Sequence, residues 1–416
     1  MKVLWITNIL FPEAAALLNG NDDLKSSGGW MLGSAYQLIC REDVNLYVAT
    51  VSPLVTSLKV LKGEKIVFYV IPQESRNSES YHKDWKLIYK DISPDIVHIY
   101  GTESIHAYAF MKSCGASNVV VSIQGLLSAC YKYYNYGITC LDVLRNITIR
   151  DLIKGSIFRS KRRFKHSSNY ELEMLKMASH VIGRTSWDKA KVWAINPHAQ
   201  YHFCNETLRS EFYDGSMWTY DKCLPHSIFI SQASYPIKGF HQLLKALPLI
   251  LRHYPDTIVK VAGNDPTAAT SIYQRVKQTG YGRLLSSIMR KYDLDKHILF
   301  LGPLNAQQMK NEYLSSNVFV SPSSIENSPN SLAEAQILGV PSISSYVGGA
   351  MDMMEGNEEN LYRFEEIEML AFKVCRIFDN KDKQINLAER AQIRHDSKQN
   401  DEKLYNIYKK IIDREL

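Results

Sequence analysis

The segment that begins at Ser321, SPSSIENSPNSLAEAQILGVPSIS, brings two carboxylates to an expected helix N-terminus. Glu326 lies in a loop after the apolar run VFVSPS, and Glu334 stands eight positions later, in the first turn of a helix that should begin near Asn330. Unpaired N–H groups and the positive dipole end of such a terminus can hold the phosphates of a nucleotide, and carboxylates can accept hydrogen bonds from sugar hydroxyls. The alternative is that Glu334 only favours the positive helix end and Glu326 is solvated.

A second segment, SQASYPIKGFHQLLKALPLIL, supplies a cation for the same chemistry. It follows the apolar run HSIFISQ and places Lys238 and Gly239 at a tight turn into a helix. Lysine at this position can neutralise a diphosphate, and glycine lets the backbone approach it closely. The dipeptide alone indicates little, because Lys-Gly is common in surface turns.

The first third of the chain offers weaker candidates. Gly28 and Gly29 precede or begin a helix, which suits a loop whose backbone approaches a phosphate or sugar, although a flexible glycine turn is the alternative. Glu103 and His106 follow the run DIVHIY and are candidate contacts for a second substrate. His98, inside that run, is expected to be an ordinary alternating strand residue.

Arg184 ends the run HVIGRT, where a fixed guanidinium could bind a phosphate. A structural ion pair is the alternative. The following Thr185, with Asp188 three positions later, has the pattern of a helix capping box.

These residues require a scaffold of parallel strands, whose carboxyl ends share one edge of a sheet. Apolar runs alternate with helical stretches in two series, and this rhythm predicts doubly wound α/β domains. The expected strands are KVLWITNIL, VNLYVATV, KIVFYVI, DIVHIY, VVVSIQ and HVIGRT in the first series, and HSIFISQ, IVKVAG, ILFLG, VFVSPS and VPSISS in the second. We predict two Rossmann-like domains, residues 1–215 and 222–394, with a C-terminal helix at about 395–416 that packs back on the first, and a substrate cleft between them.

Composition bounds the remaining possibilities. The chain has 416 residues, 45% hydrophobic and 22% charged, which is ordinary for a folded protein of two or three domains. No apolar run reaches the ~20 residues of a membrane span, and Pro12 and Glu13 interrupt an N-terminal run that superficially resembles a secretion signal. The seven scattered cysteines contain no Cys-x-x-Cys pair, so we expect a reduced, cytoplasmic protein without structural zinc.

Taken together, the two chemical segments resemble the retaining, family 4 glycosyltransferases of the GT-B fold, particularly the bacterial branch that builds surface polysaccharides. The resemblance rests on the glycine pair at Gly28, on SYPIKGFHQLL, on LGPL at 301–304 and on the Glu-x7-Glu block ENSPNSLAEA. It implies that Glu326 contacts the donor sugar, Glu334 the nucleotide ribose and Lys238 the donor diphosphate. The implied donor site also includes residues of the glycine loop, the Lys-Gly turn and the helix start: Gly28, Gly29, Gly239, Asn330, Ser331 and Leu332.

The sequence departs from the family pattern at two points. The family usually has an arginine about five residues before the lysine, but this chain has Gln232-Ala233-Ser234 there. Either another cation, for which Arg184 is a candidate, replaces it or the donor is held less tightly. Many members have a histidine where this chain has Gln124, which can bind and orient a sugar but cannot exchange a proton near neutral pH.

The formal net charge of +6 is concentrated in residues 145–166, which contain eight basic residues and one acidic residue. Ile149, Leu152, Ile153 and Ile157 of this segment have the spacing of one helical face. The basic residues Arg159, Lys161, Arg162, Arg163 and Lys165 could therefore lie on an anionic membrane surface, whereas a solvated helix packed by its isoleucines is the alternative. No recognisable motif supports nucleic-acid binding.

We therefore expect a glycosyltransferase that moves a sugar from a nucleotide-sugar donor to a hydroxyl of a lipid-linked glycan, with retention of configuration. No Asp-x-Asp tripeptide is present, and we expect neither a metal nor another cofactor. The enzyme would be cytoplasmic, at the inner face of the membrane. The alternatives are a non-catalytic, membrane-associated binding protein and a nucleotide-sugar epimerase of the same fold.

Overall fold

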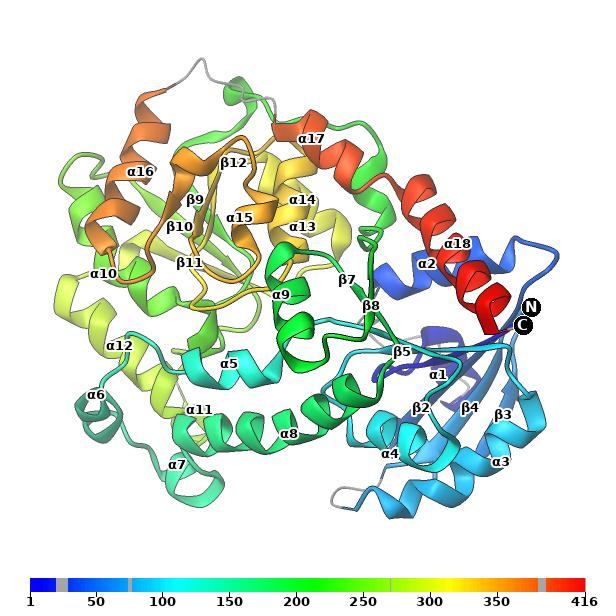
Figure 1. Cartoon of the computed structure of the whole chain (residues 1–416). Coiled ribbons are helices and arrows are strands. Elements are labelled where there is room, and N and C mark those ends of the chain that lie inside the picture. Colours follow the sequence, from blue (N-terminus) through cyan, green and yellow to red (C-terminus); the bar gives the residue numbers. More distant parts are fainter. Residues whose placement is uncertain (20–28, 74–76, 270, 381–386, 416) are drawn as a thin grey trace. The chain divides into compact units, whose positions relative to one another are not determined.

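The computed structural model describes residues 1–19, 29–73, 77–269, 271–380 and 387–415, which form two compact units (Figure 1). Unit 1 comprises Met1–Ser128, His166–Arg209 and His395–Leu416, and unit 2 comprises Ala129–Lys165 and Ser210–Arg394. Residues 129–165, which we expected in the first domain, thus pack with unit 2.

The sheet of unit 1 is parallel except at one edge. Its strand order is β3-β4-β2-β1-β5-β6-β7-β8, and among the strands described only β3 runs antiparallel to its neighbour, β4. The six strands expected from the first series are present, whereas β3 and β8 were not predicted. The strands are β1 Lys2–Ile6, β2 Asn45–Ser52, β3 Lys59–Lys62, β4 Val67–Pro72, β5 Ile96–Tyr100, β6 Val119–Ser122, β7 His180–Gly183 and β8 Gln200–Phe203.

Helices cover both faces of this sheet (Figure 1). Trp5 of β1 packs in one core cluster with Tyr408 of α18, and its indole Nε1 donates to the tyrosine oxygen at 3.1 Å. Trp85 of α3 packs edge to face on Phe110 of α4. The helices described that lie wholly in unit 1 are α1 Pro12–Asn19, α2 Gly29–Ile39, α3 His82–Ile92, α4 Ile105–Cys114, α9 Ser186–Ile195 and α18 Ser397–Glu415.

The sheet of unit 2 is entirely parallel in the residues described, with the order β11-β10-β9-β12-β13-β14. The five strands of the second series are present, and the two-residue β14 is additional. The strands are β9 Leu224–Ile230, β10 Ile258–Ala262, β11 Ile298–Gly302, β12 Ser316–Ser321, β13 Ser342–Ser345 and β14 Leu361–Tyr362. This architecture confirms the prediction of two Rossmann-like α/β domains.

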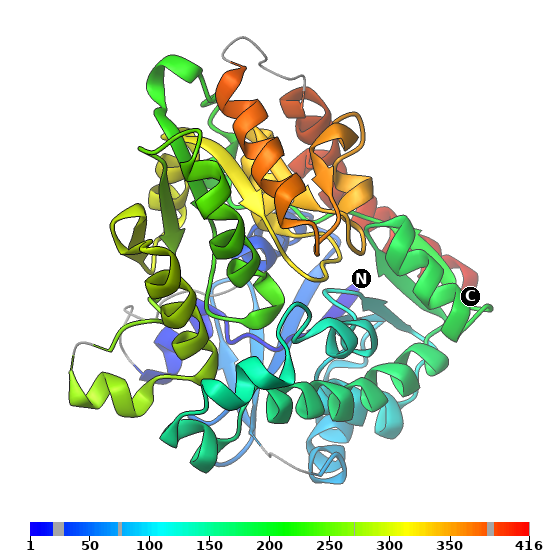
Figure 2. The ribbon, with the colours of Figure 1, turned by 90° about the vertical axis from the view of Figure 1, so that its left-hand side faces the viewer.

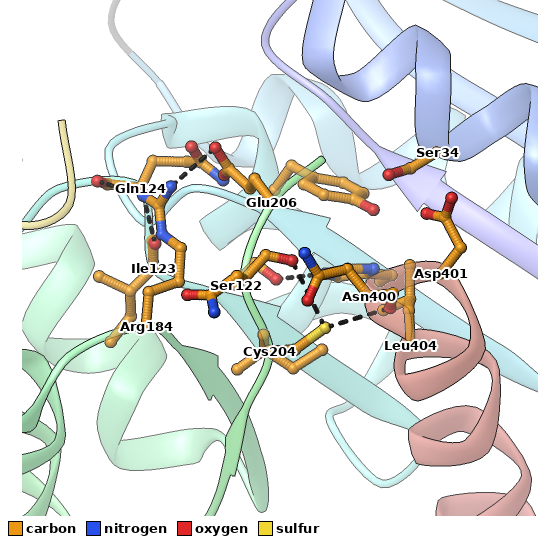
Figure 3. A pocket seen from close by; sticks show the side chains of 14 residues that line it. Ser34, Ser122, Ile123, Gln124, Arg184, Cys204, Glu206, Asn400, Asp401 and Leu404 are labelled. Carbon is orange, nitrogen blue, oxygen red and sulfur yellow. Dashed lines mark hydrogen bonds and ion pairs between the residues drawn. The ribbon is translucent and has the colours of Figure 1, made fainter. Parts of the chain in front are cut away.

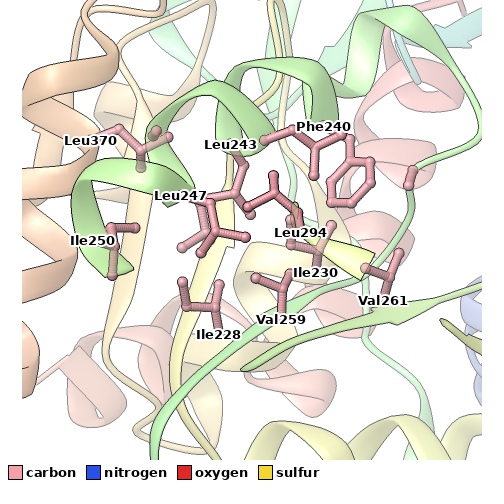
Figure 4. Packing of buried hydrophobic residues seen from close by; sticks show 14 of the residues in the cluster. Ile228, Ile230, Phe240, Leu243, Leu247, Ile250, Val259, Val261, Leu294 and Leu370 are labelled. Atoms are coloured by element: carbon pink, nitrogen blue, oxygen red, sulfur yellow. The ribbon is translucent and has the colours of Figure 1, made fainter. Parts of the chain in front are cut away.

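Helices cover both faces of the unit 2 sheet (Figure 1 and Figure 2). Alternating side chains of its strands pack against these two helical layers. On one face, Leu243 and Leu247 of α10 meet Ile228 and Val259 (Figure 4). On the other face, the ring of Phe229 packs on Tyr313 of α13. The helices include α10 Phe240–Leu251, α11 Ile272–Lys277, α12 Gly280–Tyr292, α13 Ala306–Leu314, α14 Asn330–Ile337, α15 Ala350–Met353, α16 Ile367–Asp379 and α17 Leu387–Arg394.

Residues 129–165 add the end of α5 (Leu127–Tyr133), α6 (Cys140–Arg145), α7 (Ile149–Lys154) and the start of α8 (Ile157–Met177) to unit 2. The predicted continuous helical face from Ile149 to Ile157 is wrong, because Gly155 adopts φ +88° and ends α7. None of the described helices has the length and apolar character needed to cross a bilayer.

Candidate functional site

Lys238 and Glu326, 88 positions apart in sequence, meet in unit 2. Lys238 ends a short 3-10 turn, Pro236–Lys238, after β9, and Glu326 lies in the loop between β12 and α14. Because β9 and β12 are parallel neighbours, their carboxyl ends share one edge. Lys238 Nζ donates to Glu326 Oε1 at 2.6 Å, and Ser323 Oγ donates to the same oxygen at 2.7 Å. The two side chains are 31% and 16% exposed, so both can still reach a ligand.

Gly239 lets the lysine turn lie against the loop that carries the glutamate. Its φ is +70°, and a Cβ built there would lie 1.7 Å from the carbonyl oxygen of Pro322. No side chain fits at that distance, and the left-handed backbone conformation also favours glycine. The glycine of the Lys-Gly dipeptide is therefore required by the packing of the two loops, which the sequence pattern alone did not establish.

Gly348 and Gly349 hold the backbone of Glu326. The N–H of Gly349 donates to the Glu326 carbonyl oxygen at 3.0 Å. At Gly348, whose φ is +54°, an added Cβ would lie 1.8 Å from the same oxygen. Ser323, Gly348 and Gly349 were missed as site residues. The only signal in the sequence was a glycine pair shortly after the strand VPSISS.

The helix α14 begins at Asn330, as the sequence predicted, directly after the Glu326 loop. Asn330 and Ser331 are partly exposed at its first turn, whereas Leu332 is buried. Glu334 lies in the second turn and not in the first, and it is 5% exposed. The structure thus gathers the Lys-Gly turn, Glu326 and the start of α14 at one edge of the unit 2 sheet.

The candidates of the first third are divided between the core and the surface of unit 1. Gly28 lies outside the described residues, and Gly29 is the first residue of α2. His98 bonds Tyr408 and Ser122, and burial lowers its pKa to about 3. Its expected role as a strand residue fits this environment.

His106 is also buried. Its Nε2 donates to the Thr7 carbonyl oxygen at 3.1 Å, its ring stacks on Trp85, and burial lowers its pKa to about 4. A neutral imidazole used in this way favours a structural role over a substrate contact.

Glu103, three residues after the end of β5, is partly exposed. Burial, with a smaller contribution from the charge of Glu171, raises its pKa to about 7, and Asn8 Nδ2 donates to Oε1 at 2.6 Å. Glu171 itself is fully buried and accepts hydrogen bonds from the backbone N–H groups of Leu127 and Ser128.

Arg184 lies in a polar cavity of unit 1 together with Gln124 and Glu206 (Figure 3). Its guanidinium forms a largely buried ion pair with Glu206 at 2.7 Å and donates to the Gln124 carbonyl oxygen at 3.1 Å. These contacts favour the structural ion pair that was the alternative for Arg184. The capping box is confirmed, since Thr185 Oγ1 accepts from the Asp188 N–H. Glu206 was missed because it follows β8, which was not predicted.

Of the basic residues proposed for membrane contact, Lys161 donates to Asn135 Oδ1 at 2.8 Å. Arg159, Arg162, Arg163 and Lys165 are exposed on the first half of α8. Within the described part of the chain, no cluster of three or more His, Cys, Asp or Glu side chains could hold a metal ion.

Comparison with known proteins assigns a family to the part of unit 2 that contains the Lys-Gly turn, Glu326 and the start of α14. Residues 225–394 match the family described as glycosyl transferases group 1. This segment is a group 1 glycosyl transferase domain. The match confirms the glycosyltransferase prediction for residues 225–394, and the Lys-Gly turn, Glu326 and α14 all lie within this transferase domain. No curated protein matches the sequence.

Solved structures of low sequence identity share the fold of the whole chain and confirm the GT-B prediction. Sucrose-phosphate synthase from Thermosynechococcus elongatus is similar with a TM-score of 0.71 and 16% identity, over 99% of each chain. A glycosyltransferase from Rickettsia africae has a TM-score of 0.60 and 16% identity, over 99% of this chain and 98% of that one. Anabaena HepE, solved in complex with UDP, has a TM-score of 0.61 and 14% identity, over 99% of this chain and all of its own.

Proposed function

We propose that this protein transfers a sugar from a nucleotide-sugar donor to a hydroxyl of a glycan acceptor with retention of configuration. The observation that carries the proposal is the Lys238–Glu326 pair at the carboxyl edge of the transferase-domain sheet, beside the start of α14. Retention is supported by the resemblance of the Glu-x7-Glu spacing to the retaining enzymes of family 4.

Each group has a distinct part in the proposed reaction. The bond from the anomeric carbon to the donor diphosphate breaks, the acceptor oxygen bonds to that carbon, and the proton of the acceptor hydroxyl passes to the departing diphosphate. Lys238 and the N-terminus of α14 would stabilise the charge that accumulates on the departing diphosphate, and such electrostatic stabilisation is commonly the largest catalytic effect. Glu326, held by Ser323 in the structure, would bind the donor sugar, and Glu334 the ribose.

Because these protein groups supply positive charge to the diphosphate, we propose that turnover needs no metal ion. Unit 1 would bind the acceptor, which we propose to be a lipid-linked glycan at the inner face of the cytoplasmic membrane. The UDP in the Anabaena HepE structure makes UDP-sugars the first donors to test.

A thermal-shift screen of UDP-, GDP- and dTDP-sugars should find one donor class that raises the melting temperature, because only a ligand of the folded state stabilises it. With that donor and a glycan acceptor, Lys238→Ala and Glu326→Gln should each reduce kcat/KM by about 100-fold or more. NMR of the product linkage reports retention, and undiminished turnover in a chelator reports metal independence.

The ion pair between Lys260 of β10 and Glu312 of α13, at 3.0 Å in the same unit, provides a matched control. Lys260→Ala and Glu312→Gln should leave kcat/KM near the wild-type value. Wild-type turnover in both site variants would refute the proposed site. Donor binding without sugar release would instead indicate a binding protein, and donor conversion without acceptor an epimerase.

A further inference from the structure

The segment formed by α6, α7 and the turn between them has its apolar and polar sides reversed relative to an ordinary surface helix. Leu144, Ile149, Leu152 and Ile153 are 66%, 63%, 71% and 72% exposed, although each is large and aliphatic. Leu141 and Ile147 add 52% and 38% exposure in the same segment. We call these six residues the apolar face. A monomeric protein rarely exposes so continuous an aliphatic segment unless it is a site of interaction.

Three polar residues of the same segment are turned inward and anchor it to unit 2. Asn146, Thr148 and Asp151 are 7%, 8% and 6% exposed. Asn146 accepts a hydrogen bond from Ser287 Oγ of α12 at 2.9 Å. Thr148 and Asp151 form the capping box of α7.

Two further contacts fix this attachment. Arg283 of α12 donates to the carbonyl oxygen of Ile147 at 3.1 Å. A Cβ added at Gly280, the first residue of α12, would lie 2.3 Å from Asp151 Oδ2, so the two segments pack without space for a side chain. Figure 1 shows α6 and α7 beside α11 and α12 of the same unit. The outward direction of the aliphatic side chains is therefore set by a built interface.

The surroundings of the apolar face are basic. Residues 141–165 contain eight Lys or Arg and two acidic residues, and both acids, Asp142 and Asp151, are used in capping boxes. Arg145, Lys154 and Arg159 are exposed within or next to the two helices, and further basic residues continue along α8. Aliphatic side chains bordered by cations are complementary to the acyl chains and anionic headgroups of a lipid surface.

We propose that the apolar face docks this protein on an anionic bilayer, with its aliphatic side chains inserted at headgroup depth and the surrounding cations on the lipid phosphates. This deepens the membrane location in the proposed function, and it moves the principal contact from the basic run of α8 to the apolar residues of α6 and α7. A second copy of the chain is a poorer occupant, because a twofold contact would bring the eight basic residues of each copy together.

Vesicle co-sedimentation tests the proposal with the full-length protein. The wild type should pellet with vesicles of phosphatidylglycerol and phosphatidylcholine, and much less with phosphatidylcholine alone. Leu152→Ser combined with Ile153→Ser should weaken binding by roughly 100-fold, because two large aliphatic side chains no longer insert. Arg159→Gln combined with Arg162→Gln and Arg163→Gln should also weaken it by roughly 100-fold, at about fivefold per charge.

A matched control is available in unit 1, where Val60 and Leu87 are 51% and 49% exposed. Val60→Ser combined with Leu87→Ser should bind vesicles as the wild type does. The proposal would be overturned if the Leu152/Ile153 variant bound vesicles as well as the wild type does. It would also be overturned if the wild type were a dimer in solution and the variant a monomer. The Leu152/Ile153 variant should turn over a water-soluble acceptor as fast as the wild type does. If the wild type itself did not turn over any acceptor, the proposed function would be refuted and the docking surface would not.

Discussion

Replacement of Gly239 by alanine should both destabilise the protein and inactivate it. The residue has φ +70°, and a left-handed conformation costs a non-glycine residue about 1–2 kcal/mol. The new Cβ would also stand 1.7 Å from the Pro322 carbonyl oxygen, so the backbone of that loop must move by more than an ångström. Overpacking of this kind costs about 1–3 kcal/mol, which gives about 2–5 kcal/mol in total.

The backbone that Gly239→Ala would displace belongs to the loop that carries Glu326. Pro322 immediately precedes Ser323, which donates to Glu326, and displacement of reacting groups by about 1 Å can reduce turnover by about 100-fold. Urea denaturation would report the free energy of unfolding, and kcat/KM would report the geometry of the site.

Gly215 provides the matched control, because its φ is +81° but no neighbouring atom lies within 4 Å of an added Cβ. Gly215→Ala should lose only the conformational component, about 1–2 kcal/mol, and retain full turnover. If Gly239→Ala unfolded at the same urea concentration as Gly215→Ala and kept wild-type kcat/KM, the packing explanation for the Lys-Gly turn would be wrong.

Three further predictions concern unit 1. Arg184→Gln should lower the free energy of unfolding by about 3–5 kcal/mol because it leaves Glu206 as an uncompensated buried charge. Urea denaturation in a double-mutant cycle of Arg184 and Glu206 measures their coupling, and additive losses would contradict the pairing. The pKa of Glu103 is raised from 4.5 to about 7, so the folded protein binds this proton more tightly than the unfolded chain does. Stability should therefore fall by about 1–3 kcal/mol for this half-buried group as the pH rises from about 4.5 to 7. Thermal melts over a pH series should show that Glu103→Gln removes this dependence of stability on pH. Thr185→Ala should cost about 1 kcal/mol through loss of the α9 cap, and an unchanged urea midpoint would count against the capping role.

The interior strands could be predicted because each is a short apolar run bounded by turn residues. Three of the four edge strands could not: β3 is KVLK, with exposed lysines at both ends, β8 is the polar QYHF, and β14 has two residues. Such strands are defined by pairing with a neighbour and not by a pattern of their own. The segment from Ile149 to Ile157 has helical spacing, but Gly155 breaks it, and a glycine within a periodic pattern does not reveal its φ angle.

The site was predictable in its residue types but not in its contacts. The helix start at Asn330 follows from local signals, whereas the 2.6 Å contact of Lys238 with Glu326 depends on the order of β9 and β12 in the sheet. Arg184 shows the converse case. Its position at a strand end invited a ligand role, and its partner Glu206 follows a strand too polar to recognise.

The interleaved composition of the two units determines when each can be completed during synthesis. Tyr133 and Tyr136 offer carbonyl oxygens to Ser324 and His241, which the ribosome adds more than a hundred residues later. The core of unit 1 in turn includes Tyr408, which follows the whole of unit 2 in the sequence. Unit 1 can therefore complete its core only after all of unit 2 has been synthesised, and the aliphatic residues of α6 and α7 leave the ribosome before α12, which anchors them.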